Sequence, residues 1–94
     1  MQIRSVRHKG LRRLLEEDDH RGVRADFINR IRAILTALAV ADSMEELQGP
    51  PGWRIHQLVG QRAGVWSFSV SGNWRMTFTI DDNALCDLDL EDYH

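Results

Sequence analysis

The spacing of apolar residues changes once along this chain, and this change restricts the possible folds more than any other feature of the sequence. In the first half, apolar side chains recur with the 3.6-residue period of a helix at Phe27, Ile28, Ile31, Ile34, Leu35 and Leu38. From Trp66 onward they recur at every second residue, as in a strand with one dry and one solvated face. A chain that forms helices first and paired strands afterwards belongs to the α+β class.

Three segments carry the two-residue alternation: 66–71, 74–80 and 86–91. The sequences between them are rich in Gly, Asn, Asp and Ser, which favour tight turns. We therefore predict a meander of three antiparallel strands, in which Cys86, with Leu88 and Leu90, faces the core. A fourth strand is predicted within residues 53–59, and weaker alternation at residues 3–7 indicates a strand at the N-terminus.

Helices are predicted ahead of this meander. Leu11, Leu14 and Leu15 form a short amphipathic stripe, and the longer stripe described above ends near Leu38. Ser43 and Glu46 have the spacing of a capping box, which predicts the start of another short helix. The helices are the available cover for the apolar side of the sheet. The expected fold is thus an N-terminal strand and helices packed on one face of a twisted antiparallel sheet.

Length and composition indicate one small domain over residues 1–94. A single cysteine, Cys86, excludes an internal disulfide, and the histidines do not have the spacing of a zinc site. Apolar runs are too short to cross a bilayer, and no signal-peptide-like stretch follows Met1. We expect a cytoplasmic protein with no cofactor, no metal and no contact with a membrane.

Charge is distributed unevenly around a net value of -2. Residues 1–32 hold nine basic and five acidic side chains, whereas residues 81–94 hold six acidic side chains and no Lys or Arg. Such polarity is compatible with a basic surface that contacts a polyanion. On charge alone, however, solvated helix faces are the favoured interpretation.

The polar positions of the strands define a second face, which we expect to be open to solvent. They are Ser67, Ser69, Arg75, Thr77 and Thr79. Arg75 is a cation among small hydroxyl side chains. From the pattern alone, it either pairs with an aspartate across the sheet, at position 87 or 89, or binds an anion. His56 alone would be interpreted as a surface histidine, and residues 91–94 as a frayed tail.

Three segments together resemble the HigB-type toxins of the RelE/ParE superfamily, with the GraT-like branch as a possible subgroup. They are His-Gln-Leu-Val-Gly at 56–60 with the following residues to 67, Asn-Trp-Arg-Met-Thr-Phe at 73–78, and Glu-Asp-Tyr-His at 91–94. Residues 3–11 resemble the start of the family, so the likeness spans almost the whole chain. It implies a RelE-like fold and the toxin of a two-gene toxin–antitoxin module. Such toxins cleave mRNA in the ribosomal A site without a metal and thereby inhibit translation.

The resemblance assigns the catalytic residues His56, Arg75, Asp92, Tyr93 and His94. In the implied reaction, a ribose 2′-OH attacks the adjacent phosphate. His56 or His94 would transfer protons, because a histidine pKa of ~6.5 suits either role near neutrality. Arg75 would stabilise the charge on phosphorus, Tyr93 would stack on a base or share in proton transfer, and Asp92 would orient a histidine.

One position departs from the family pattern. Val59 stands where the family commonly has a lysine, and valine cannot hold a phosphate. Arg62 is the candidate to supply the missing charge, and Arg62 and Arg54 are predicted to bind RNA. The alternative is a weaker toxin, or one with a different substrate geometry.

Two other functions remain open on this sequence. One is a ParE-like toxin that inhibits DNA gyrase, against which the set of His56, Arg75 and His94 argues. The other is an RNA- or antitoxin-binding module with weakened catalysis, for which Val59 is the support. The implied partners are a helix-turn-helix antitoxin of the HigA type, the ribosome and mRNA. Operator DNA would be contacted only through the antitoxin.

Overall fold

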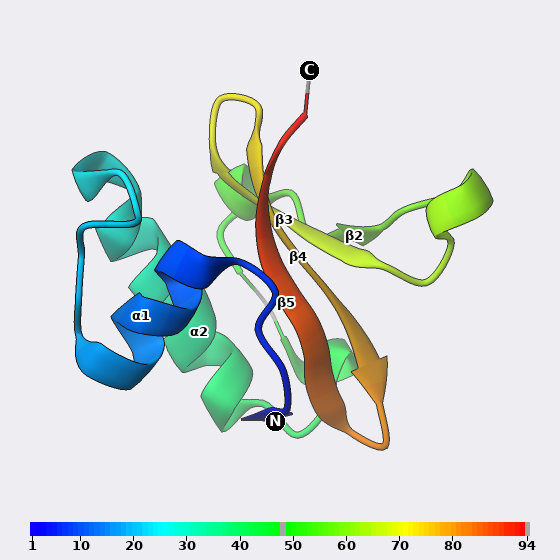
Figure 1. Ribbon diagram of the computed structural model, residues 1–94. Coiled ribbons are helices and arrows are strands. Elements are labelled where there is room, and N and C mark those ends of the chain that lie inside the picture. The colour runs from blue at the N-terminus through cyan, green and yellow to red at the C-terminus, as the bar shows by residue number, and fades with distance from the viewer. Residues whose placement is uncertain (48, 94) are drawn as a thin grey trace.

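A five-stranded sheet with the strand order β1-β5-β4-β3-β2 forms the centre of the computed structural model, which describes residues 1–47 and 49–93 (Figure 1). The strands are β1 (Gln2–Ile3), β2 (His56–Gln57), β3 (Trp66–Ser71), β4 (Trp74–Asp81) and β5 (Ala84–Asp92). β3, β4 and β5 are antiparallel neighbours, which confirms the predicted meander.

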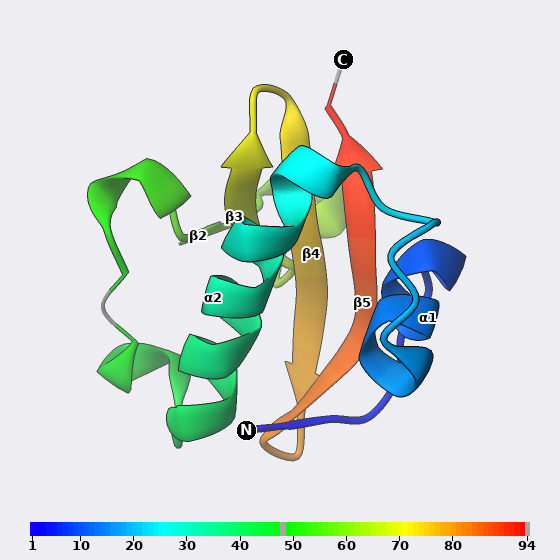
Figure 2. The ribbon, with the colours of Figure 1, turned by 90° about the vertical axis from the view of Figure 1, so that its left-hand side faces the viewer.

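Two helices, α1 (Lys9–Glu17) and α2 (Ile28–Val40), lie on the same side of the sheet (Figure 2). The Nδ1 atom of His8 accepts a hydrogen bond from the Leu11 amide at 3.0 Å and so caps the start of α1. Short 3₁₀ turns occupy Ala25–Phe27 (η1), Met44–Glu46 (η2), Pro51–Trp53 (η3) and Gly60–Arg62 (η4). The predicted α+β fold is therefore confirmed.

No helix in the two described ranges is long and apolar enough to span a membrane.

The N-terminal strand is shorter than predicted and pairs in parallel with β5. Gln2 lies opposite Ala84, and Val6 adds an isolated parallel bridge to Leu88. A parallel pair requires a long crossover between its strands. Here the helices and three strands intervene, so local alternation in the sequence could not indicate this pairing.

Two predictions about residues 43–59 are wrong in part. Ser43 makes no capping hydrogen bond with its side chain, and the predicted helix is the single turn η2. The Glu46 carboxylate instead accepts a hydrogen bond from the Asp42 amide at 3.1 Å. The predicted strand over residues 53–59 is limited to β2, because Trp53 ends η3 and Arg54 has a left-handed φ of 48°.

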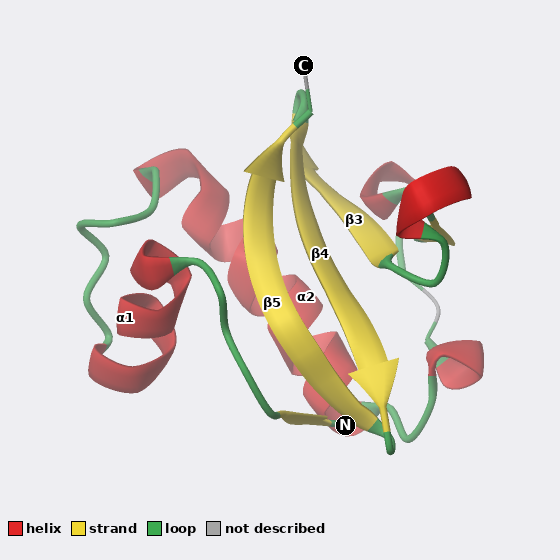
Figure 3. Ribbon diagram, turned by 45° about the vertical axis from the view of Figure 1, so that its right-hand side comes forward, coloured by secondary structure: helices red, strands yellow, loops and turns green. Residues whose placement is uncertain are grey.

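A bulge in β5 reverses the predicted orientation of Cys86. Thr79 lies opposite Cys86 while Thr77 lies opposite Asp89, so β5 holds one residue more than β4 between these pairs. Asp87, within the bulge, has a left-handed φ of 55°. Cys86 is half-buried, and the core positions of β5 are Leu85, Leu88 and Leu90. Figure 3 shows β4 and β5 curving together along their length.

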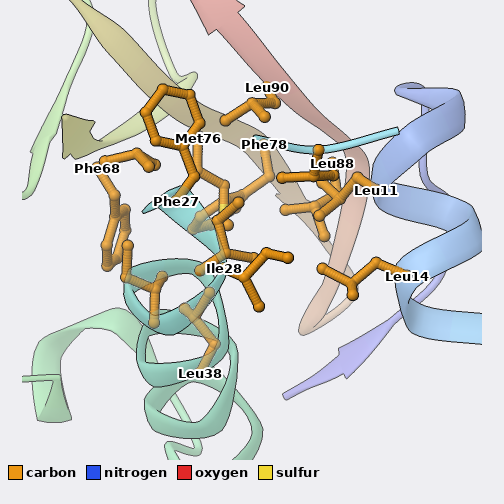
Figure 4. Close-up of a cluster of buried hydrophobic side chains, with 14 of the residues drawn as sticks. Leu11, Leu14, Phe27, Ile28, Leu38, Phe68, Met76, Phe78, Leu88 and Leu90 are labelled. Carbon is orange, nitrogen blue, oxygen red and sulfur yellow. The ribbon is translucent and has the colours of Figure 1, made fainter. Parts of the chain in front are cut away.

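The hydrophobic core fills the space between the helices and one face of the sheet, which we call the apolar face (Figure 4). It includes Leu11 and Leu14 of α1 and four residues of α2. On the sheet, the Phe68 and Phe78 rings pack with centroids 5.6 Å apart. Each such side chain contributes about 1.5–3 kcal/mol through its burial. The apolar face therefore stabilises the fold.

Candidate active site

The opposite face of the sheet is covered, although the sequence predicts an open, solvated surface there. Ser67 and Thr77 are 0% and 2% exposed, and Ser69 is also buried. Four longer polar side chains lie on the same face. They are Arg62 of the turn η4, Arg75 of β4, Glu91 of β5, and Tyr93, which follows β5. These seven residues form what we call the polar face. The prediction of an open surface is wrong at its centre, where Arg75 contacts Ser69 and Glu91 contacts Thr77.

Arg75 lies in a row of the sheet with Ser69 on β3 and Glu91 on β5. Its Nη1 atom donates to Ser69 Oγ at 3.1 Å and to the carbonyl oxygens of Gly72 at 2.9 Å and Trp74 at 3.3 Å. All three acceptors are neutral. Within residues 1–47 and 49–93, no carboxylate forms an ion pair with Arg75, so the predicted alternative of a pair with an aspartate is wrong. The Arg75 guanidinium is therefore a candidate to bind an anion.

Tyr93 lies on the same face as Arg75, as the sequence predicts. The Cζ atom of Arg75 is 6.0 Å from the centroid of the tyrosine ring, and the Cζ atom of Arg62 is 5.9 Å from it. The Tyr93 amide donates to the Asn73 carbonyl at 2.9 Å. This bond fixes the residue that follows β5, so the interpretation of a frayed tail does not apply to Tyr93.

Arg62 and Glu91 form a bidentate ion pair beside this tyrosine. The two contacts between guanidinium and carboxylate measure 2.6 and 2.9 Å, and the Thr77 hydroxyl also donates to Glu91. The hydrogen bonds from Arg62 lower the pKa of Glu91 below its ordinary value, against the opposing effect of burial. The charge of Arg62 is therefore already compensated within the protein.

His56 lies on the edge strand β2 directly opposite Ser67, so its side chain shares the face of Thr77 and Arg75. Strand spacing puts its Cα about 12 Å from the Cα of Arg75. Nδ1 of His56 lies 2.6 Å from the Arg54 carbonyl. A carbonyl oxygen only accepts, so Nδ1 carries the hydrogen, and Nε2 of the neutral ring is the nitrogen left to accept a proton.

Asp92, one of the predicted site residues, is not brought to this face. Asp92 pairs with Trp74 across the strands, and Trp74 packs on Phe27 against the apolar face. Asp92 therefore points to the side opposite Tyr93 and away from His56. His94 lies outside the described residues. Arg54 is exposed and enters the site through its carbonyl oxygen, which orients His56.

Val59, at the position of the missing lysine, is 87% exposed. It lies in the β2–β3 loop, residues 58–65, which extends away from the body of the molecule (Figure 1). A shallow hollow of about 480 Å³ runs from Leu58 and Val59 past Arg62 to Tyr93. An extended ligand on this hollow would therefore pass both the loop and the chain end.

Sequence reasoning missed Glu91 and the role of Thr77 as its partner. Both were recognised as polar positions, but their contacts depend on the register of β4 against β5 and on a loop 29 residues away. No local pattern carries that information.

In the part of the chain that the structure describes, no group of three or more His, Cys, Asp or Glu side chains could hold a metal ion.

Comparison with known proteins identifies the family. Residues 4–94 match the model for the RelE-like toxin of type II toxin–antitoxin system HigB. A protein named endoribonuclease HigB from Proteus vulgaris is 39% identical over 92 residues, which are 98% of this chain and 99% of that protein.

Two solved structures of YafQ from E. coli share the fold. One is a point mutant, with a TM-score of 0.55 and 16% identity, and the other comes from strain BL21(DE3), with a TM-score of 0.53 and 14% identity. Each likeness covers 92% of this chain and 88% of the other. These structures support the RelE-like fold, whereas the family is identified by the match to the HigB model and by the 39% identical relative. The chain belongs to the HigB-like family, the RelE-like toxins of type II toxin–antitoxin systems.

Proposed function

We propose that this toxin is an endoribonuclease that cleaves mRNA in the ribosomal A site and thereby inhibits translation. The observation that carries the proposal is Arg75, a rigidly held guanidinium with neutral hydrogen-bond acceptors, next to an aromatic ring on the polar face. Its charge is suited to the phosphate of an RNA chain. The similarity to a protein named as an endoribonuclease supports the same reaction.

In the proposed reaction, Nε2 of His56 takes the proton of a ribose 2′-OH. The freed oxygen bonds to the adjacent phosphorus while the bond to the 5′-oxygen of the next nucleotide breaks. The products are a 2′,3′-cyclic phosphate and a 5′-OH, whose proton comes from an acid. Arg75 stabilises the extra negative charge on the phosphate oxygens in the transition state.

The acid is assigned to the end of the chain. Tyr93 and His94 are the candidates that the family resemblance gives, and the ring of Tyr93 lies beside Arg75. Tyr93 is also suited to stack on a base, which contributes about 1–3 kcal/mol. The position of Asp92 on the other side of β5 does not support a contact with His56, so a role of Asp92 in orienting a histidine would concern His94.

The charge distribution favours a substrate that is positioned by a larger partner. Several arginines of the basic N-terminal segment pair with aspartates of the same chain, among them Arg21 with Asp19 and Arg32 with Asp18. These pairs reduce the positive charge that the N-terminal segment offers to free RNA. We therefore propose that the ribosome positions the mRNA, that Arg54 contacts a phosphate, and that the protein acts in the cytoplasm.

Membership of the family implies an antitoxin partner. We further propose that this antitoxin is a helix-turn-helix protein of the HigA type. Operator DNA would then be contacted through the antitoxin and not by this chain.

Purified toxin, programmed ribosomes and a labelled mRNA test the proposal, with primer extension as the readout. Cleavage within the A-site codon that requires ribosomes is the expected result. Intact mRNA together with inhibited DNA supercoiling by gyrase would instead support a ParE-like toxin. Neither effect, with antitoxin binding retained, would identify a binding module without catalysis.

A further inference from the structure

Four side chains on the polar face are connected in a line, and the reaction above uses only the last of them, Tyr93 at the chain end. The Thr77 hydroxyl, buried on β4, donates to the Glu91 carboxylate on β5. Glu91 in turn accepts both contacts from Arg62, and Arg62 donates from Nη1 to the Tyr93 hydroxyl at 3.3 Å. A buried strand residue is thus connected through Glu91 and Arg62 to the aromatic ring at the chain end.

We propose that Glu91 is a positioning residue for RNA cleavage. It anchors Arg62, and Arg62 holds the Tyr93 ring in place beside Arg75. This inference rests on the proposed function, because it assigns to Tyr93 a place at the reacting phosphate.

The structure of the β2–β3 loop gives the first reason to regard Glu91 as the anchor of Arg62. Its backbone hydrogen bonds are local, from the amide of Leu58 to Val65, from Ala63 to Gly60 and from Val65 to Arg62. Glycines with left-handed φ values of 73° and 91° lie at positions 60 and 64. The side chain of Arg62 bonds across from this loop to β5 and Tyr93. Without Glu91, the loop would lose its bidentate anchor on the sheet.

Charge gives the second reason. Tyr93 has one guanidinium at 5.9 Å and another at 6.0 Å from its ring centroid, and both are positive. The Glu91 carboxylate lies in the same row of the sheet as Arg75 and compensates Arg62. Removing that negative charge leaves two cations near the same ring that repel each other. Arg62, the more exposed and loop-borne of the two, would then move toward solvent.

Glu91→Gln is the test variant, because the amide keeps the size of the side chain and removes its charge. Asp87→Asn is the matched control. It removes a carboxylate from the same strand, whose partner Arg7 lies 3.5 Å away, and asparagine tolerates the left-handed φ at this position. Asp87 is exposed and contributes to neither Tyr93 nor Arg62 in the contacts described above.

Tyr93 is the one tyrosine of the sequence, so 3-fluorotyrosine labelling gives a single ¹⁹F resonance from the ring in question. We expect Glu91→Gln to change its chemical shift and narrow its line, as the ring becomes more mobile, while Asp87→Asn leaves both unchanged. On programmed ribosomes, Glu91→Gln should lower kcat about tenfold with KM within about twofold, since a misplaced group weakens the transition state more than binding.

An unchanged ¹⁹F signal in folded Glu91→Gln, or equal changes in both variants, would overturn the proposal. If Glu91→Gln does not fold, Arg62→Lys on the exposed turn makes the same test and should move the resonance in the same direction. Wild-type protein that fails to cut mRNA would contradict the proposed function, and the ¹⁹F comparison would still decide whether Glu91 holds the ring.

Discussion

The two faces of the sheet are both buried at their centres, but by different means. On the apolar face, Phe68 and Met76 are covered by the helices and by other apolar side chains. On the polar face, Ser67 and Thr77 are equally inaccessible, but here the groups in contact are polar: the Thr77 hydroxyl donates to the Glu91 carboxylate. Burial therefore does not by itself distinguish a stabilising core from a site. The chemistry of the covering groups makes the distinction, and substitutions on the two faces should have different consequences.

The largest effect on stability is expected from Phe68→Ala on the apolar face. The ring is fully buried and contacts Phe78 and Trp53, so its removal leaves a cavity. We expect a loss of about 3–5 kcal/mol in the free energy of unfolding, measured by urea denaturation. A loss below about 1 kcal/mol would show that this face does not form the core.

Arg75→Ala on the polar face should act in the opposite way. It removes a charge held by neutral acceptors, so we expect little change in the unfolding free energy and in antitoxin affinity. Cleavage of mRNA should fall about 100–1000-fold, the range for loss of a group that stabilises transition-state charge. A variant that remains fully toxic in a growth assay, or one that unfolds, would contradict the distinction between the faces.

The ion pair between Arg62 and Glu91 on the polar face predicts that the free energy of unfolding depends on pH. Because Arg62 lowers the pKa of Glu91 below its ordinary value of 4.5, the folded protein favours the ionised carboxylate. This contribution is fully present above about pH 4.5 and is lost as the pH falls through the lowered pKa. Wild type should exceed Glu91→Gln in unfolding free energy by about 1 kcal/mol at pH 7, and by less at pH 3. A difference between the two proteins that grows toward pH 3 would show that Glu91 does not have a lowered pKa in the folded protein.

The smallest effect is expected from Val59→Lys, which adds a cation to the β2–β3 loop without disturbing packing, since this side chain is exposed. Cleavage should rise a few-fold at low salt and less at high salt, as one more phosphate contact would give. Rates on programmed ribosomes at two salt concentrations measure this. Val59→Gln serves as the uncharged control. A marked loss of activity would mean that the loop does not face RNA phosphates.

Local periodicity predicts the parts of this fold that depend on neighbours in sequence. The stripe from Phe27 to Leu38 lies on the helix η1–α2, and the turn at residues 71–73 joins two of the predicted strands. The sequence does not indicate the bulge at Asp87, because the alternation of Cys86, Leu88 and Leu90 with polar residues fits an unbroken strand equally well. The parallel pairing of β1 was hidden as well, since it joins residues about 80 positions apart.

The candidate site divides in the same way. Strand parity predicts that Arg75 and Tyr93 lie on one face, and their contact confirms this placement. The ion pair of Arg62 with Glu91 depends on how a loop folds back over the sheet, which alternation does not encode. The family resemblance predicts that Asp92 orients a histidine, whereas Asp92 and Tyr93 point to opposite sides of β5. Neighbouring residues of a strand point to opposite faces, and this geometry separates them.

Crosslinking tests most directly whether the polar face is the one that contacts mRNA. A photoreactive amino acid replaces either Tyr93 on the polar face or Val40, which is 79% exposed on α2, the helix that covers the apolar face. Both proteins also carry Arg75→Ala so that the mRNA stays intact on the ribosome. We predict crosslinks to mRNA from position 93 and none from position 40. Crosslinks from position 40 alone would contradict the account.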